Sequence, residues 1–371
     1  MSFLQSFGLK WDPFFMHPLA TDKDLRLFIN REKELKNAIE AVRLSKNLLI
    51  AGVWGIGKTS FINALRHTLL RKEDNLFFMD VRPHTLLGPK GLNSRSLLVA
   101  LALELEKQKS PPSDKPFTLE RIRRHEEYID ALSRITSIGE LLLIIESSIE
   151  ELQKKGKKVI FIFDDVDKTS FDLKILAGIR DSLWKMNVVY VFSSNIRQYQ
   201  SVIDSAMEPF FLGILLEGFN ELQTKELIDK RIRMASDKSI EDVMNLDAIP
   251  VIQRLSQGNP RTILGICDFA FRQAFSRGVN RVAASDVFEY VTKQMIFSSL
   301  ELNVINILSE FPQGLSVSEI YQKLTKENIS ISRPRVSQIL GALSRRGLVK
   351  VRKSGRFNIY TSVISMEVKS E

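Results

Sequence analysis

Residues 52–60, GVWGIGKTS, combine glycines, a lysine and hydroxyl side chains at a spacing suited to binding phosphate. The glycines allow consecutive backbone N–H groups to curl around phosphate oxygens. Lys58 would reach the β- and γ-phosphates of ATP, and the Thr59 hydroxyl would ligate Mg²⁺. The predicted nucleotide-binding residues of this loop are Gly52, Val53, Trp54, Gly55, Ile56, Gly57, Lys58, Thr59 and Ser60.

Acidic side chains follow an apolar run in VIFIFDDVDK, residues 159–168. Magnesium needs oxygen ligands on a rigid element, and a buried strand that ends in a carboxylate supplies one. Asp164 would hold the metal through water. Asp165 stands where many such enzymes place a glutamate to orient the attacking water, and because aspartate is one methylene shorter, we expect slow hydrolysis. For Asp165 and Asp167, a solvated strand end is an equally good interpretation.

The elements that must position these residues are also visible in the sequence. A buried strand over 47–52 precedes the loop and a helix over 58–70 follows it, which is the context that a phosphate-binding loop requires. A helix is expected over 29–44. Continuous apolar runs separated by helical segments indicate an α/β fold with a parallel sheet covered on both faces. The other four predicted strands lie at 75–81, 157–165, 187–195 and 210–217.

Changes in pattern divide the chain into four predicted parts. Residues 1–20 are rich in Phe, Trp and Pro without a clear period, and we expect an irregular arm that packs on the segment after it. The nucleotide-binding core spans 21–217; within it, residues 82–156 form a long insertion whose role the sequence does not show. Short helices over 218–295 predict a lid. From 296 to 371, three helices and two alternating strands predict a winged helix.

Composition limits the class of protein. The 371 residues, 44% hydrophobic and 26% charged, suit a globular protein of two or three domains. The apolar runs are far shorter than the roughly 20 residues that cross a bilayer, so we expect no membrane contact. No secretory signal is visible. A single cysteine, Cys267, excludes an internal disulfide and a metal site of several cysteines, so we expect a cytoplasmic protein.

The formal net charge of +9 is concentrated near the C-terminus, where residues 332–356 hold eight basic residues and no acidic one. The predicted helix of this segment carries an apolar stripe at helical spacing, Val336, Ile339, Leu340 and Leu343. Burial of that stripe would present the polar side chains to the major groove of DNA, while a basic hairpin holds the phosphates. The predicted contacts to double-stranded DNA are Arg333, Arg335, Ser337, Gln338, Arg345, Arg346, Lys350, Arg352, Lys353 and Arg356.

Two alternatives exist for this basic segment: a surface that docks a protein, and a charged face that is merely solvated. Basic residues on both DNA-contacting elements of a winged helix favour DNA. If only phosphates are contacted, the domain would bind any duplex and lose affinity steeply with salt.

These motifs together resemble an AAA+ ATPase: the glycine loop, the apolar strand ending in two aspartates, a fourth strand ending in Asn195, and GNPR at 258–261. With the C-terminal winged helix, the chain resembles the archaeal and eukaryotic origin-recognition family of replication initiators, and the related STAND signalling ATPases. The resemblance implies a P-loop NTPase core of the AAA+ type.

The resemblance also implies roles for residues outside the loop. Asn195 would be sensor 1, contacting the γ-phosphate or the lytic water, and Arg261 would be sensor 2, closing from the lid on the triphosphate. The alternatives are a strand-capping asparagine and a surface arginine at a helix N-terminus. FINREKE at 28–34 resembles the family's element before the first strand, with Asn30 in place of glycine; Asn also visits left-handed conformations. Arg31 would then lie near the nucleotide.

One feature of the AAA+ pattern is missing. Ring-forming motors supply an arginine finger between sensor 1 and the fifth strand, but this segment offers only Arg197. A slow ATP-dependent switch is therefore favoured over a continuously cycling motor.

The sequence thus predicts a cytoplasmic, DNA-associated ATPase, with ATP and Mg²⁺ as cofactors, that binds double-stranded DNA in a nucleotide-dependent way. The alternatives are a STAND-type signalling ATPase whose winged helix docks a protein, and an ATPase that assists transposition or the maintenance of a plasmid or virus. Self-association and a protein partner both stay open.

Overall fold

A computed structural model describes most of the chain as two compact units. One unit is Pro18–Glu217, and the other joins Met1–His17 to Gly218–Glu371. The described residues are 3–81, 94–109, 131–132, 134–135, 137–164, 176, 178–203, 208–294, 298–327, 329–345, 348–354 and 357–362.

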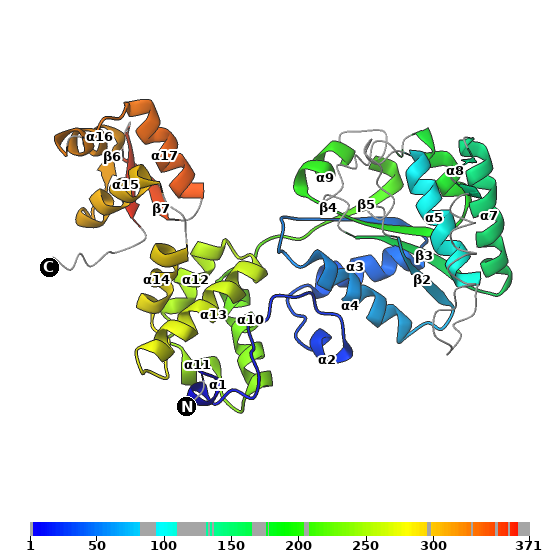
Figure 1. Cartoon of the computed structure of the whole chain (residues 1–371), viewed down its shortest axis with the longest axis horizontal. Coiled ribbons are helices and arrows are strands. Elements are labelled where there is room, and N and C mark those ends of the chain that lie inside the picture. The colour runs from blue at the N-terminus through cyan, green and yellow to red at the C-terminus, as the bar shows by residue number, and fades with distance from the viewer. Residues whose placement is uncertain are drawn as a thin grey trace. The chain divides into compact units, whose positions relative to one another are not determined.

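The core unit contains the predicted parallel sheet (Figure 1). Its five strands run in the order β2-β3-β4-β1-β5, and every pairing is parallel. The central strand β1 places Leu48 opposite Val191 on one side and Leu212 on the other. The strands are β1 (Asn47–Ala51), β2 (Leu76–Asp80), β3 (Lys158–Phe163), β4 (Val189–Ser194) and β5 (Phe211–Leu215). The predicted α/β fold with five strands is confirmed.

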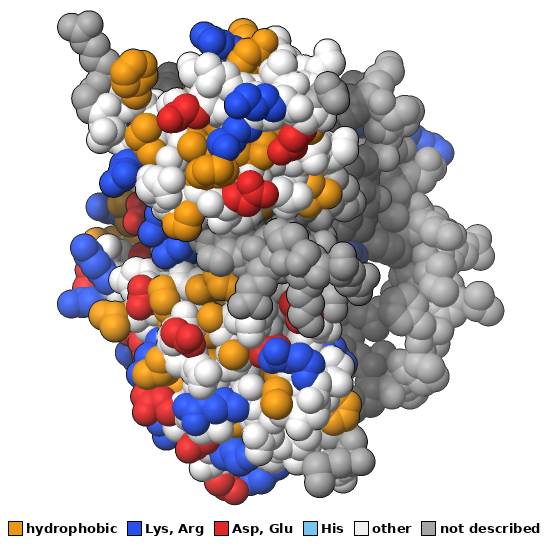
Figure 2. All heavy atoms as spheres, turned by 90° about the vertical axis from the view of Figure 1, so that its left-hand side faces the viewer, with side chains coloured by type: hydrophobic (Ala, Val, Ile, Leu, Met, Phe, Trp, Pro, Cys, Tyr) orange, Lys and Arg blue, Asp and Glu red, His pale blue; other side chains and the backbone are white. Residues whose placement is uncertain are grey.

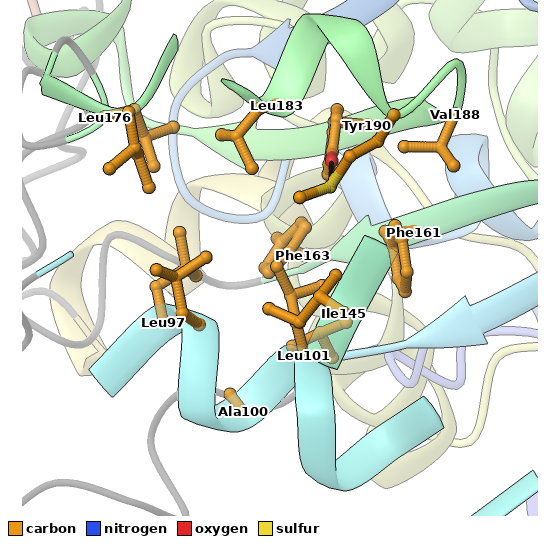
Figure 3. Close-up of a cluster of buried hydrophobic side chains, with 14 of the residues drawn as sticks. Leu97, Ala100, Leu101, Ile145, Phe161, Phe163, Leu176, Leu183, Val188 and Tyr190 are labelled. Atoms are coloured by element: carbon orange, nitrogen blue, oxygen red, sulfur yellow. Dashed lines mark hydrogen bonds between the residues drawn. The ribbon is translucent and has the colours of Figure 1, made fainter. Parts of the chain in front are cut away.

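Helices cover both faces of this sheet because alternate residues of each buried strand point to opposite sides. Leu48 and Ile162 pack on one side with α3 and α4, and Phe161 and Tyr190 pack on the other with α5, α7 and α8 (Figure 3). Two helices of the 82–156 insertion, α5 and α7, therefore help to cover the sheet. The helices are α2 (Asp22–Leu25), α3 (Glu32–Arg43), α4 (Lys58–Leu70), α5 (Ser94–Lys109), α7 (Ile138–Lys154), α8 (Arg180–Lys185) and α9 (Ile196–Ile203), with the 3₁₀ turn Glu208–Phe210.

The other unit begins with Met1–His17, most of the predicted N-terminal arm, which packs on the lid helices. The end of the arm contacts α4, since the Leu19 N–H donates to the Ser60 hydroxyl and the Leu19 carbonyl accepts from the Asn63 amide. The rings of Phe7 and Phe14 each lie 4.8 Å from Phe271 of α13, where they are fully buried. Arg231 of α10 donates hydrogen bonds to the carbonyls of Pro13 (2.8 Å) and Phe15 (3.1 Å). The arm is irregular apart from one short helix, because its large rings complete a core that the lid helices leave open.

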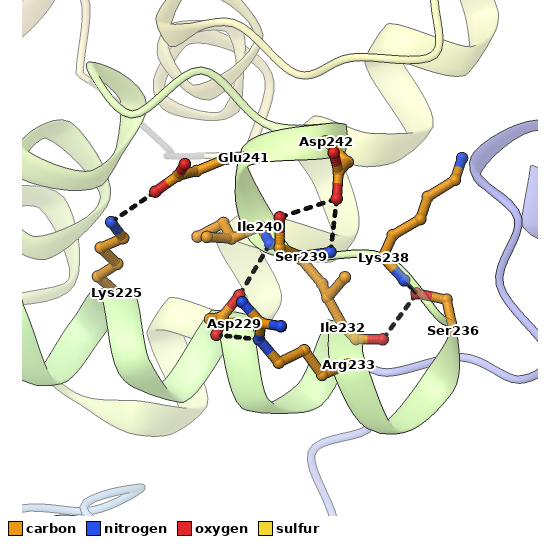
Figure 4. Close-up of polar contacts among 10 residues, drawn as sticks. All are labelled: Lys225, Asp229, Ile232, Arg233, Ser236, Lys238, Ser239, Ile240, Glu241 and Asp242. Atoms are coloured by element: carbon orange, nitrogen blue, oxygen red, sulfur yellow. Dashed lines mark hydrogen bonds and ion pairs between the residues drawn. The ribbon is translucent and has the colours of Figure 1, made fainter.

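The lid is helical, as predicted, but two of its helices are longer than expected: α10 has 15 residues and α13 has 17. Its first corner, between α10 and α11, is held by polar contacts (Figure 4). Asp229 accepts a hydrogen bond from the Ile240 backbone at 2.9 Å, and Lys225 pairs with Glu241 at 3.0 Å. The helices of this region are α1 (Phe3–Phe7), α10 (Glu221–Ala235), α11 (Ile240–Val243), α12 (Ala248–Ser256), α13 (Pro260–Ser276) and α14 (Ala284–Gln294).

The C-terminal domain contains the three predicted helices and the predicted hairpin, and is of the winged-helix type. A two-residue strand, β6, adds a third member to its antiparallel sheet, in the order β6-β8-β7. The sequence did not predict β6 because two residues carry no alternation. The elements are α15 (Ser299–Glu310), β6 (Leu315–Ser316), α16 (Val317–Lys326), α17 (Arg333–Arg345), β7 (Val349–Ser354) and β8 (Phe357–Ser362).

Among the residues that the structure describes, no helix is long and apolar enough to cross a membrane.

Candidate functional site

The glycine loop joins β1 to α4, as the sequence predicts. Gly55 and Gly57 have φ angles of 85° and 99°, a left-handed region that side chains disfavour, so glycine is needed to make the turn. Gly57 occupies the N-cap of α4, and the helix begins at Lys58. The positive end of the helix dipole and its first N–H groups therefore point at the loop, an arrangement that binds phosphate.

Three side chains converge beside this loop. Lys58 is 8% exposed, and its Nζ donates a hydrogen bond to the Gly52 carbonyl at 3.0 Å. The Thr59 hydroxyl donates to Asp164 Oδ2 at 2.6 Å, so the start of α4 meets the carboxyl end of β3. The Ser193 hydroxyl, from β4, donates to the other carboxylate oxygen of Asp164. The loop lysine, a hydroxyl and a carboxylate are thus brought together as predicted.

Ser193 was missed by the sequence reasoning. It is fully buried in β4, next to Ser194, in a strand that is otherwise apolar. Two adjacent serines at the end of an apolar strand were the available signal, since a buried hydroxyl requires a polar partner. The partner it finds, Asp164, directly follows the neighbouring strand.

The oxygen donors at this point fit a magnesium ion that is bound together with a nucleotide. No group of three or more His, Cys, Asp or Glu side chains among the described residues forms a metal cage by itself. Mg²⁺ does not need one, because it commonly takes one or two protein oxygens and keeps waters and phosphate oxygens as its other ligands. The Thr59 hydroxyl and the Asp164 carboxylate, 2.6 Å apart, are such a pair.

Asn195 follows β4 directly and caps the next helix. Its Oδ1 accepts a hydrogen bond from the backbone N–H of Gln198 at 2.9 Å, in the first turn of α9. The sequence left open a strand-capping role for this asparagine, but the observed contact instead caps the helix that follows the strand. Because the oxygen makes this contact, it is the amide nitrogen that would donate to a phosphate oxygen.

Arg31 is buried at the start of α3, where its side chain links this helix to the segment after β5. Its Nη1 lies 3.3 Å from Glu34 Oε1, and its other terminal nitrogen donates to the carbonyl of Glu217, after β5. Burial lowers the pKa of Arg31, and Glu34 partly offsets that effect. Asn30 has φ 57°, which confirms that asparagine takes the left-handed conformation expected of the glycine it replaces.

Other predicted site residues lie elsewhere or outside the described residues. Asp165 and Asp167 lie in the undescribed segment directly after Asp164, and Arg346 and Arg356 lie outside the described residues of the C-terminal domain. Arg261 is half-buried at the second position of α13, in the other unit.

The structure shows why Gly258, Asn259 and Pro260 of the GNPR motif stand where they do, which the sequence reasoning missed. A Cβ on Gly258 would lie 2.1 Å from the Phe219 carbonyl oxygen, so only glycine allows the two backbones to touch. Asn259 caps α13 by accepting from the backbone N–H groups of Arg261 (3.1 Å) and Thr262 (3.3 Å), and Pro260 occupies the first turn. The first three residues of the motif therefore fix where Arg261 enters the helix.

The basic C-terminal surface is arranged as predicted. The apolar stripe of α17 is buried, and every described residue predicted to contact DNA is exposed. Arg335 Nη1 donates to Gln338 Oε1 at 3.1 Å, and Arg352 Nη2 donates to the Gln313 carbonyl at 3.1 Å. Figure 2 shows one face of the molecule, on which basic, acidic and hydrophobic side chains are interspersed.

Two known sequence families match parts of this chain. Residues 29–209 match the family described as KAP family P-loop domain. This region is a P-loop NTPase domain. Residues 297–369 match the family described as Penicillinase repressor, in agreement with the winged-helix fold of the C-terminal domain. No curated protein sequence gives a significant match to the chain.

Solved structures share the fold of nearly the whole chain. The structure of Cdc6p from Pyrobaculum aerophilum has a TM-score of 0.51 and a sequence identity of 14%. The match spans 94% of this chain and 93% of the Cdc6p chain. The structure of the ORC2 protein from Aeropyrum pernix, in ADPNP-ADP complexes, has a TM-score of 0.50 and a sequence identity of 12%. The match spans 94% of this chain and 92% of the ORC2 chain. At these identities the likeness shows a common fold: a P-loop NTPase core, as in the ORC2 and Cdc6p structures, with a winged-helix domain.

Proposed function

We propose that this protein binds ATP with Mg²⁺ in its core, hydrolyses it slowly, and uses the nucleotide to control how its winged helix binds duplex DNA. The single observation that carries the proposal is the convergence of Lys58, Thr59 and Asp164 at the glycine loop, where Thr59 and Asp164 lie 2.6 Å apart. The nucleotide complexes named for the structurally similar ORC2 protein support the same ligand class.

In this proposal each residue of the loop has a defined task. Backbone N–H groups of residues 52–60 and the N-terminus of α4 bind the phosphates, and the Lys58 ammonium neutralises part of their charge. Thr59 and Asp164 hold Mg²⁺, Asp164 through water; when bound, the ion offsets the negative charge that develops on the transferred phosphoryl group. Ser193 orients the Asp164 carboxylate by donating to its second oxygen.

Hydrolysis is proposed to be slow because the groups that would act on the γ-phosphate and the attacking water provide only weak catalysis. Asn195 would donate its amide to the γ-phosphate or the lytic water while its oxygen caps α9. Asp165 would orient the water with a shorter side chain than glutamate. Arg261 would act as a second sensor from the lid, and Arg31 would lie near the nucleotide. The one arginine between Asn195 and β5, Arg197, provides no separate finger, which favours a switch over a motor.

The nucleic-acid half of the proposal rests on α17 and the β7–β8 hairpin. Arg333, Arg335, Ser337, Gln338 and Arg345 would face the major groove, where Arg, Gln and Ser side chains read base edges. The hairpin cations Lys350, Arg352 and Lys353, followed by Arg356, would contact phosphates, with Arg346 completing the set. On this proposal the protein is cytoplasmic and associated with DNA.

A role like that of the replication initiators is the specific form of this proposal, since the fold is shared along the whole chain. A role in transposition or in plasmid or virus maintenance would use the same DNA contacts. The second candidate is a STAND-type signalling switch whose winged helix docks a protein. The absence of a separate arginine finger in the sequence favours that switch equally, whereas the basic residues of α17 and the hairpin favour DNA.

Binding of a labelled random-sequence duplex at several salt concentrations, with ATP, with ADP and with neither, tests this proposal. We expect affinity to fall steeply with salt, and the triple variant R335A/R352A/K353A to lower the salt slope by about 2, because Arg352 and Lys353 are the two cations among them that would contact phosphates. The triple variant K36A/K46A/K154A removes the same charge from exposed sites on the core and should bind DNA like wild type. The variant K58A should lose the response to nucleotide. Absence of binding in every nucleotide state would overturn the DNA half of the proposal and favour a protein partner.

A further inference from the structure

The tip of the winged-helix hairpin carries an exposed aromatic ring. Phe357, the first residue of β8, is 68% exposed and pairs across the hairpin end with Ser354. In the described part of the C-terminal domain, the other strongly exposed large hydrophobic side chain is Val351, on β7. The aromatic residues Phe311 and Tyr321 are instead half-buried, each beneath a basic side chain. A single exposed hydrophobic side chain is common on protein surfaces, so the argument depends on what surrounds Phe357.

The strand pairing places this ring on the same face as basic residues. Residues directly opposite each other in an antiparallel pair point to the same side, and alternate residues share a face. One face of the hairpin therefore carries the side chains of three opposed pairs: Ser354–Phe357, Arg352–Ile359 and Lys350–Thr361. Arg352 is the diagonal neighbour of Phe357 on that face, at a separation that long side chains span.

The opposite face of the hairpin is the one that packs on the domain core. Val349 and Tyr360 are 3% and 8% exposed, and Leu315, which pairs with Tyr360, is also buried. The face with Phe357, Arg352 and Lys350 is thus the outer face of the small sheet. Its outer end is formed by an apolar ring at the start of β8 and by two cations on the paired strand β7.

We propose that Phe357 is a wedge that enters the minor groove of duplex DNA and partly unstacks one base step, bending the duplex. This rests on the proposed function, because the cations must first hold the DNA. Proteins that bend DNA in this way insert an apolar side chain between base steps and hold the flanking phosphates with basic residues. Lys350 and Arg352 supply those contacts on the same face, and no acid lies between residues 332 and 356 to repel the backbone.

A duplex fits this surface better than a single strand. Domains that bind single strands stack successive bases on several aromatic side chains along a groove. The described hairpin presents a single exposed ring, and its other aromatic residue, Tyr360, is buried. One ring is enough to unstack one step of a duplex.

The test measures the end-to-end distance of a duplex of about 30 base pairs, labelled with a donor and an acceptor fluorophore, in the presence of the full chain. Wild type should shorten this distance by an amount that corresponds to a bend of at least about 20°. F357A should abolish most of the bend while lowering affinity by less than about tenfold, because the ring's burial is largely offset by the cost of unstacking. F357L keeps an apolar wedge and should retain much of the bend.

The controls separate this inference from the proposed function. L222A removes an equally exposed hydrophobic side chain, 78% exposed at the start of α10, and should bend DNA like wild type. If wild type binds the duplex and F357A bends it equally, the wedge is refuted while the DNA-binding proposal stands. Preferential binding of wild type to single-stranded DNA, lost in F357A, would also refute the wedge and assign the ring to base stacking. If wild type binds no DNA, the proposed function fails and the wedge fails with it.

Discussion

In the core, Lys58 is 8% exposed, and the hydroxyls of Thr59 and Ser193 both donate hydrogen bonds to the Asp164 carboxylate. In the C-terminal domain, Arg335, Lys350 and Lys353 are exposed, and Phe357 projects from a hairpin tip. The first arrangement fixes a few atoms around a small ligand, so each side chain has a precise position. The second spreads charge over a surface that an extended polyanion can cover, so each side chain contributes separately. The two regions should therefore respond differently to substitution.

The largest effect is expected in the core from D164N. The amide can still accept a hydrogen bond from Thr59, so the fold should persist, but the negative charge that holds Mg²⁺ is lost. We expect Mg²⁺-dependent ATP turnover to fall roughly 1,000-fold, since such a metal stabilises the transition state by several kcal/mol. Phosphate release assays with wild type and D164N measure it. DNA binding without nucleotide should be unchanged; parallel loss of both activities would mean that the two regions are not built independently.

K58A should have the next largest effect. Removing the ammonium deletes charge-assisted hydrogen bonds to phosphate, so the affinity for ATP should fall about 100-fold. Titration with a fluorescent ATP analogue, with circular dichroism to verify folding, measures the loss. The matched control is K46A, an exposed lysine just before β1, which should bind ATP normally. Unchanged nucleotide affinity in K58A would contradict the assignment of the loop.

The smallest effect is expected at an exposed helix cap, Glu319 of α16. Hydrogen bonds from the Ser316 backbone N–H, and then from its hydroxyl, lower the pKa of Glu319 below its usual 4.5. A carboxylate whose folded pKa is lowered stabilises the fold above the unfolded pKa, and this contribution is lost as pH falls through the folded pKa. E319Q should therefore be less stable than wild type at pH 7 by under about 1 kcal/mol, with the difference disappearing near pH 3.

Urea unfolding of both proteins at the two pH values measures this difference. An effect that persists at low pH would show that the charge is not its source. A small, titratable effect here would sharpen the contrast with the core, where a single substitution is expected to remove most of the activity.

The parts of the fold that the sequence predicts are those set by local pattern. The glycine loop and the start of α4 at Lys58 are marked by residues adjacent in sequence, and the buried face of α17 follows from helical spacing. The five strands are visible because each contains a run of apolar residues, as is typical of strands in a parallel sheet.

The parts that the sequence does not predict depend on contacts between distant segments. The partner of Ser193 directly follows another strand, and the approach of Gly258 to Phe219 joins the middle of the lid to its start. The exact partner of the arm was not predicted for the same reason, because aromatic composition shows that Phe7 and Phe14 need a partner but not that Phe271 provides it. A contact between segments that are distant in the chain leaves no local pattern in a single sequence from which it could be predicted.

The packing of the arm on α13 also sets the order in which the chain is completed during translation. Phe14 leaves the ribosome early, but Phe271 is synthesised roughly 250 residues later, on the order of 10 to 50 s at usual elongation rates. In that interval the whole of Pro18–Glu217 emerges as one continuous segment and can fold. The aromatic rings of the arm stay without their native partner until then, so the lid can close only after the whole core has emerged, and these rings are exposed on the nascent chain in the interval.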